Sequence, residues 1–359
     1  MFKLLFIMKL TKYFFKKKNN SSLLNLKILF IIIMILSSLI AINSSSWFMM
    51  WMSMEMNLMS FIPLMMNSSK KIKISNSMMI YFIIQAMASS ILIMIIIMMK
   101  LQNNIIKMNF LMNMMQLSLL MKLGASPFHW WTPKIFNNLS WMNCFMFLTW
   151  QKIIPLFLLM NFNNNFMIYI SALTSSFMGA MLGINQISIK LIMNYSSINH
   201  LGWMLMTLMI NKNLLLMYFM FYSLINLMIS LIMNNYNFKF INQLFKNNNQ
   251  NMNMKLIMMS MFLSLSGMPP MLGFLPKILT LMLMIKNNMI METLMFIILS
   301  TISLSFYINI LMSMFIFSKN NSKWMNKNNF NFNKTIFSIL LLNLMLMLII
   351  IIPLLNMLM

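Results

Sequence analysis

Four ionisable side chains lie inside long apolar stretches of the sequence. The stretches are MMWMSMEMNLMSF with Glu55, LLMKLGASPFHWW with Lys122, LTWQKIIPLFLL with Lys152, and GFLPKILTLML with Lys277. A charge at the middle of a membrane span costs roughly 2.5–3.5 kcal/mol on insertion scales, so residues of this kind are usually functional. Glu55 and Lys152 are central in their stretches and are the stronger candidates. Lys122 lies at the end of an apolar run, two residues before Gly124, where a lysine reaching toward the interface also fits.

The chemistry that a buried acid and buried amines support is proton transfer. A lysine in water has a pKa of about 10.4 and holds its proton too tightly to release it near neutral pH. Burial can lower a lysine pKa by up to ~3–5 units, and a nearby carboxylate raises it again. A buried lysine whose acidic partner moves can therefore take up and release a proton in turn, which arginine cannot do. His129 and His200 fit either a proton relay or a hydrogen-bonded packing role.

The composition is that of a polytopic membrane protein. Of the 359 residues, 61% are hydrophobic and only 8% are charged, whereas soluble domains carry about 25% charged residues. The net charge of +24 would favour nucleic acid as the partner of a soluble protein, but the lysines mostly lie between apolar runs, so we expect no nucleic-acid partner. The single cysteine, Cys144, excludes a disulfide framework and a cysteine-based metal site. No nucleotide-binding loop, metal-ligand cluster or nucleophile–base arrangement stands out.

Apolar runs of about 20 residues predict an all-α bundle with about eleven transmembrane helices. The predicted spans are 23–43, 47–66, 77–99, 106–123, 141–160, 166–186, 191–210, 214–233, 256–284, 288–317 and 335–357. The ninth span contains Gly267-Met268-Pro269-Pro270, which predicts a discontinuous helix or a tight helical hairpin near Gly267–Pro270.

The distribution of lysine supports this topology. Eighteen lysines fall in the loops on the side of the N-terminus and only four in the loops on the opposite side. This bias is the positive-inside pattern. All 26 basic residues are lysine and 55 residues are Met, which indicates A/T-rich mitochondrial coding, so we expect the N-terminus in the matrix. We divide the chain into a basic interfacial segment, residues 1–22, and a transmembrane domain, residues 23–359.

Five stretches give the sequence a specific resemblance. They are WMSMEMN (51–57), MKLGASPFHWWTP (121–133), LSWMNCFMFLTWQKIIP (139–155), NYSSINHLGWM (194–204) and SLSGMPPMLGFLPK (264–277). In order and in residues they resemble the family of mitochondrially encoded NADH dehydrogenase (ubiquinone) subunit 2. Members of this family are antiporter-like membrane subunits of respiratory complex I.

The resemblance implies a role for each candidate residue. Glu55 and Lys122 match the acid and lysine of the family's ion pair. Lys152 matches its central lysine, and Lys277 matches the lysine on the broken helix at the exit side. His200, in the stretch YSSINH, is a relay candidate on the hydrated axis.

The function that the resemblance implies is that of a core membrane-arm subunit of proton-pumping NADH:ubiquinone oxidoreductase in the mitochondrial inner membrane. Its partners would be neighbouring complex I subunits and membrane lipids. The chain would be an enzyme only as a subunit, since NADH, FMN, iron–sulfur clusters and ubiquinone would be bound by other subunits. Two alternatives remain open at this point: a free-standing cation/proton antiporter and a purely structural membrane-arm subunit.

Overall fold

The computed structural model describes residues 21–66, 71–101, 105–162, 166–246, 252–269 and 271–315. These residues form α-helices and loops, together with one isolated antiparallel bridge between Ser188 and Phe240. The predicted all-α fold is confirmed. Helices occupy ten of the eleven predicted spans, whereas 335–357 and residues 1–20 of the predicted interfacial segment lie outside the described residues.

Six helical segments of the described residues are long and apolar enough to cross a membrane, one of them being Trp141–Leu159, which joins α7 (Trp141–Leu148) and α8 (Trp150–Leu159). A chain with this many apolar helices is a multi-pass membrane protein, as the composition predicts. The count of eleven crossings stays a prediction.

The described residues fall into two compact units. Unit 1 contains the residues up to Gly124 and those from Trp130 to Phe162. Unit 2 contains Ala125–His129 and the residues from Phe166 onward. The helices of unit 1 are α2 (Ser21–Asn43), α3 (Trp47–Met65), α4 (Lys71–Leu101), α5 (Ile105–Leu123), α6 (Trp131–Phe136), α7 (Trp141–Leu148) and α8 (Trp150–Leu159).

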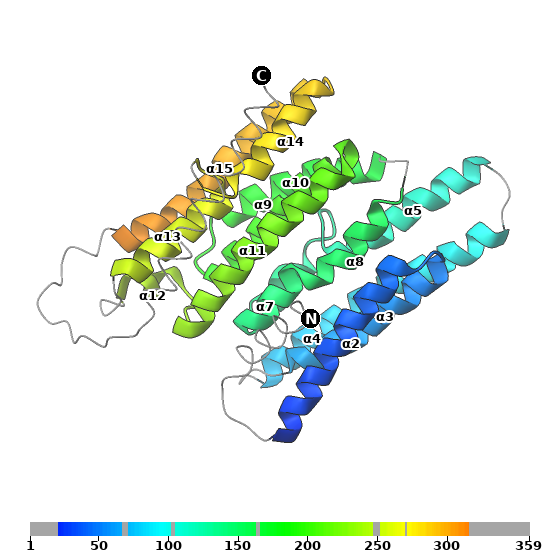
Figure 1. The fold of residues 1–359 in the computed structure, drawn as a ribbon, viewed down its shortest axis with the longest axis horizontal. Coiled ribbons are helices and arrows are strands. Elements are labelled where there is room, and N and C mark those ends of the chain that lie inside the picture. The colour runs from blue at the N-terminus through cyan, green and yellow to red at the C-terminus, as the bar shows by residue number, and fades with distance from the viewer. Residues whose placement is uncertain are drawn as a thin grey trace, which may run out of the picture. The chain divides into compact units, whose positions relative to one another are not determined.

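In unit 1, α2 packs against α3, and α4 packs against α5 (Figure 1). A cluster of aromatic rings joins α3, α4, α6 and α7. The ring of Tyr81 lies 5.5 Å from Phe61, 6.2 Å from Trp131 and 6.4 Å from Phe147, measured between centroids. Edge-on pairs such as Phe61–Tyr81 are the favoured aromatic geometry, so the cluster fixes the position of the Tyr81 ring.

The predicted span 141–160 is divided into two helices at Thr149. The backbone of Thr149 has φ −115° and ψ −68°, and its hydroxyl donates to the Phe145 carbonyl oxygen at 2.8 Å. Pro155 lies inside α8 and has no N–H to donate to the carbonyl of Gln151 four residues earlier. The helix that carries Lys152 therefore begins at a break and is weakened again one turn later.

The other seven helices of the described residues belong to unit 2. They are α9 (Phe166–Gly183), α10 (Ile189–Ile210), α11 (Lys212–Tyr236), α12 (Ile241–Lys246), α13 (Met252–Ser266), α14 (Phe274–Lys286) and α15 (Ile290–Phe315). The predicted break of the ninth span is confirmed, because α13 ends at Ser266 and α14 begins at Phe274. Gly267 has φ +78°, a conformation that favours glycine, and it follows the last residue of α13.

Close packing of α9 on α10 predicts a glycine requirement in unit 2. A Cβ added at Gly179 would lie 2.5 Å from the backbone nitrogen of Asn199, whereas one added at Gly183 would meet only the Phe306 ring, at 2.9 Å. We expect Gly179→Ala to destabilise the protein by about 1–3 kcal/mol, because two helix backbones must separate. Thermal unfolding of the protein in detergent measures this.

The matched control is Gly183→Ala, because the added Cβ there requires only the Phe306 side chain to move. Equal unfolding midpoints for the two variants would show that the close backbone contact at Gly179 does not make this position more sensitive to an added Cβ than Gly183.

Candidate proton-transfer site

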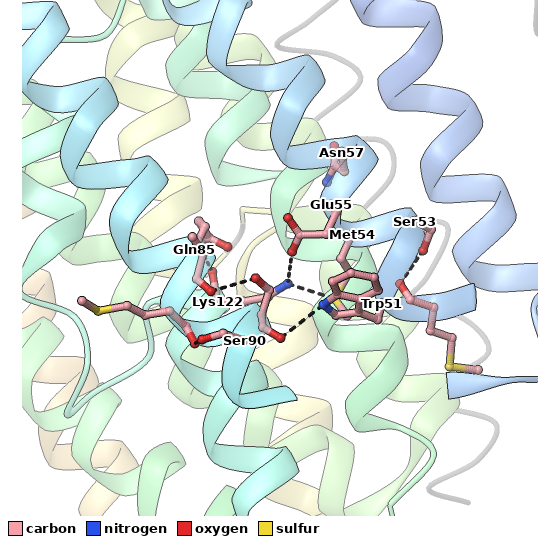
Figure 2. Close-up of polar contacts among 12 residues, drawn as sticks. Trp51, Ser53, Met54, Glu55, Asn57, Gln85, Ser90 and Lys122 are labelled. Carbon is pink, nitrogen blue, oxygen red and sulfur yellow. Dashed lines mark hydrogen bonds and ion pairs between the residues drawn. The ribbon is translucent and has the colours of Figure 1, made fainter. Parts of the chain in front are cut away.

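The acid and the first lysine of the site meet between α3 and α5. Nζ of Lys122 lies 3.9 Å from Oε1 of Glu55, and the two side chains are 4% and 24% exposed. Figure 2 shows them pointing toward each other, with Gln85 of α4 beside Lys122. Nζ of Lys122 also lies 3.7 Å from Sδ of Met54, and Nε2 of Gln85 donates to the Lys122 carbonyl oxygen at 3.2 Å. At this distance the two opposite charges attract each other.

The end of α5 sets the place of Lys122. The amide of Gly124 donates to the Met121 carbonyl at 3.2 Å, and Gly124 has φ +69°. A Cβ at Gly124 would also approach the Trp131 ring to 3.1 Å. The Gly in the stretch MKLGASP thus ends the helix two residues after the lysine.

Lys152 lies in the first turn of α8 and is 4% exposed. A cavity of about 20 Å³ is lined by both Lys122 and Lys152. A second cavity of about 20 Å³ also reaches Lys122 and extends toward Asn57 of α3 and Pro155 of α8. A volume of this size can hold about one water molecule when polar groups line it. The site therefore offers a short polar route between the two lysines.

Three uncharged polar side chains fill the space beside this route. Oε1 of Gln151 accepts from Nδ2 of Asn57 at 3.1 Å and from the hydroxyl of Tyr81 at 3.1 Å. In return, Nε2 of Gln151 donates to Oδ1 of Asn57 at 3.3 Å. This Asn57–Gln151–Tyr81 cluster ties the first turn of α8 to α3 and α4. The cluster was not predicted from the sequence. Two signals could have indicated it: the amide of Gln151 directly precedes Lys152, and the amide of Asn57 lies two residues after Glu55.

Lys277 lies in unit 2, at the start of α14, and is 5% exposed. Its Nζ donates to the carbonyl oxygen of Ser266 at 2.7 Å and lies 5.7 Å from the centre of the Trp203 ring. A Cβ on Gly267 would come within 2.8 Å of Lys277 Cδ. The helix break thus supplies both the acceptor for the ammonium group and the room for the side chain.

His200 lies in α10 of unit 2 among buried tyrosines. Its Nδ1 is 2.8 Å from the hydroxyl of Tyr218, and its ring centre is 5.2 Å from that of Tyr222. Glu292, the second acid of the chain, accepts from the Tyr169 hydroxyl at 2.6 Å and is only partly buried. The structure therefore brings Glu55, Lys122 and Lys152 together in unit 1, while Lys277 and His200 belong to unit 2.

Metal binding has no candidate in the part of the chain that the structure describes, since no three His, Cys, Asp or Glu side chains there are grouped to hold an ion. The chemistry available to the described residues is that of an acid, buried amines, an imidazole and phenols.

An all-helical membrane protein with an ion-paired acid and buried lysines has the features of an antiporter-like transporter subunit. The family described as NADH:quinone oxidoreductase/Mrp antiporter, TM, matches residues 44–305. A solved structure of respiratory complex I from Thermus thermophilus contains a chain of similar fold, with a TM-score of 0.76 and 16% identity over 90% of this chain and 78% of that one. The Mrp complex from Dietzia contains another, with a TM-score of 0.70 and 15% identity over 80% and 60% of the two chains.

Curated relatives narrow the family further. The NADH-ubiquinone oxidoreductase chain 2 of Anopheles gambiae is 40% identical over 84% of this chain and 89% of the relative. The proteins of the same name from Locusta migratoria and Loxodonta africana are 37% and 34% identical, over 80% and 76% of this chain and 84% and 80% of the relatives. The chain belongs to the NADH:quinone oxidoreductase/Mrp antiporter family and, within it, to the NADH-ubiquinone oxidoreductase chain 2 proteins. The predicted resemblance is confirmed.

Proposed function

We propose that this chain is a core membrane-arm subunit of a proton-pumping NADH:ubiquinone oxidoreductase, respiratory complex I, in the mitochondrial inner membrane. Its family membership supports the assembly with other complex I subunits, and its apolar helices support the multi-pass topology. The lysine bias of the loops supports a matrix N-terminus. The proposal keeps the predicted division into an interfacial segment, residues 1–22, and a transmembrane domain, residues 23–359.

One observation carries the pumping role: Lys122 contacts Glu55 and also lines a cavity with Lys152. When the Glu55 carboxylate is close, it stabilises the ammonium form of Lys122. When the two separate, the buried ammonium group loses that stabilisation and becomes a better proton donor. The pair can thus convert a change of distance into release of a proton.

The released proton passes to Lys152. An N–H bond of the Lys122 ammonium group breaks, and a water molecule in the cavity takes up that proton. The water then gives one of its own protons to the neutral Lys152 amine. Lys122 ends as an amine and Lys152 as an ammonium group, so charge and protons balance. Lysine suits both positions because each must hold its proton in one state and give it up in another.

Lys277 and His200 serve the later part of the path in this proposal. The carbonyl of Ser266 at the break between α13 and α14 stabilises a charged Lys277, as in the broken helices of transporters. His200 and the Tyr218 hydroxyl, 2.8 Å apart, can exchange a proton and form a relay. Electron transfer belongs to other subunits, which bind NADH, FMN, iron–sulfur clusters and ubiquinone. In this proposal the chain takes part in the enzyme reaction only as a subunit, without a complete active site of its own.

A free-standing cation/proton antiporter would use the same buried groups, and the family description includes Mrp antiporters. Isolation of the native chain from mitochondrial membranes in mild detergent separates the two functions. We expect the chain in a very large particle that oxidises NADH and shows flavin and iron–sulfur absorption. A small, colourless particle that exchanges cations for protons on its own would overturn the proposal.

A further inference from the structure

Apart from the lysines themselves, the residues that line the cavities beside Lys122 and Lys152 are uncharged. The two cavities share four lining residues, which are Tyr81, Gln85, Lys122 and Gln151. Only one of the cavities reaches Lys152. A proton that leaves Lys122 for Lys152 through this cavity therefore moves along walls to which Tyr81 and Gln151 contribute.

The hydrogen bonds of the cluster fix the direction of the Tyr81 hydroxyl. Its O–H donates to Oε1 of Gln151 at 3.1 Å, and that oxygen also accepts from Asn57. A carbonyl-type oxygen has two lone pairs, so Gln151 is fully engaged as an acceptor. The Tyr81 oxygen keeps its own lone pairs for a donor in the cavity.

We propose that Tyr81, oriented by Gln151, is a positioning residue for the water that carries the proton from Lys122 to Lys152. The inference rests on the proposed pumping function. The water donates one hydrogen to the Tyr81 oxygen, which leaves a lone pair for the Lys122 ammonium group and its second hydrogen for the Lys152 amine. Tyr81 neither gains nor loses a proton. It fixes the geometry of the transfer, whose rate depends steeply on alignment.

Two features of the structure support orientation rather than plain packing. The Tyr81 ring is held by Phe61, Trp131 and Phe147, so packing places the ring without help from the hydroxyl. The reciprocal amide bonds with Asn57, together with the Tyr81 bond to Oε1, restrain the Gln151 side chain. A hydrogen-bonded cluster of buried and half-buried side chains favours a single arrangement.

The test uses assembled complex I carrying Tyr81→Phe, which removes one oxygen and keeps the ring. We expect normal assembly, proton pumping per complex about tenfold slower, and a larger solvent deuterium isotope effect on that rate. A packing role alone would change the amount of assembled complex but leave the isotope effect of each complex unchanged. Tyr236→Phe is the matched control, because Tyr236 lies at the exposed end of α11.

Gln151→Met is a second test, because it removes the group that orients the Tyr81 hydroxyl. The double variant Tyr81→Phe with Gln151→Met should pump no more slowly than the slower of the two single variants. Parental rates and isotope effects in whichever of these variants assembles would overturn the inference. Lys152→Met measured alongside keeps the two proposals apart. Loss of pumping in Lys152→Met with parental Tyr81→Phe and Gln151→Met contradicts only the role of Tyr81. Retained pumping in Lys152→Met would overturn the proposed pumping role of this chain and the inference with it.

Discussion

Replacing Lys152 with methionine is expected to cause a severe loss of coupled proton pumping in assembled complex I. Methionine fills a similar volume at this buried position but cannot carry a proton, so the Lys122 proton loses its acceptor. Removal of a proton-transfer group typically lowers a rate by about 10²–10⁴-fold. We therefore expect pumping per complex to fall about a hundredfold, and NADH oxidation coupled to it to slow. The pumping rate is measured as proton uptake into vesicles that contain the complex, followed with a pH-sensitive dye.

The control for this variant is Lys134→Met, which removes the same charge from an exposed position in α6. It should pump at the parental rate. Normal assembly together with normal pumping in Lys152→Met would identify the chain as a structural subunit of the membrane arm.

The breaks in the helices show what the sequence can and cannot predict. Glycine and proline at 267–270 predict the end of α13, since both disfavour a continuing helix, and the structure has the break there. The break at Thr149 has no such residue. It depends on the Thr149 hydroxyl bond to Phe145 and on the tertiary packing of α8, neither of which a local pattern contains. Pro155, the one breaker in this region, lies inside a helix instead.

The residues of the candidate site also fall into those that the sequence predicts and those that it does not. Charged residues in apolar runs are rare and costly, so Glu55, Lys122, Lys152 and Lys277 stand out in the sequence. Asn57 does not, because asparagine is common throughout this chain and reflects its codon bias. Its contact with Gln151 crosses 94 residues of sequence. Only the fold of unit 1 shows that an amide two residues from Glu55 holds the helix of Lys152.

Helix α3 therefore contacts, through polar groups, the two helices that carry Lys122 and Lys152. Glu55 faces Lys122 of α5, and Asn57 holds Gln151 of α8. A shift of α3 that separates Glu55 from Lys122 also acts on the first turn of α8, where Lys152 lies. The donor and the acceptor of the proposed transfer thus respond to one element, which is what an ordered transfer requires.

The dependence of Lys122 on Glu55 leads to a prediction for a double-mutant cycle with Glu55→Gln and Lys122→Met. We expect each single variant to lower proton pumping per assembled complex about tenfold or more, because each removes one half of the 3.9 Å pair. The double variant should pump no more slowly than the slower single variant, since residues that act as a unit do not lose function twice. The pumping assay of the four complexes gives the coupling directly.

Glu292→Gln controls for the loss of an acid, because Glu292 is bound to Tyr169 in unit 2 and lies outside the pair. It should leave pumping unchanged. If the losses in the cycle simply multiplied, Glu55 and Lys122 would act independently, and a change in their separation could not drive proton release. Non-additive loss would mean that the state of Lys122 is set by its carboxylate, so the acid controls when the lysine gives up its proton.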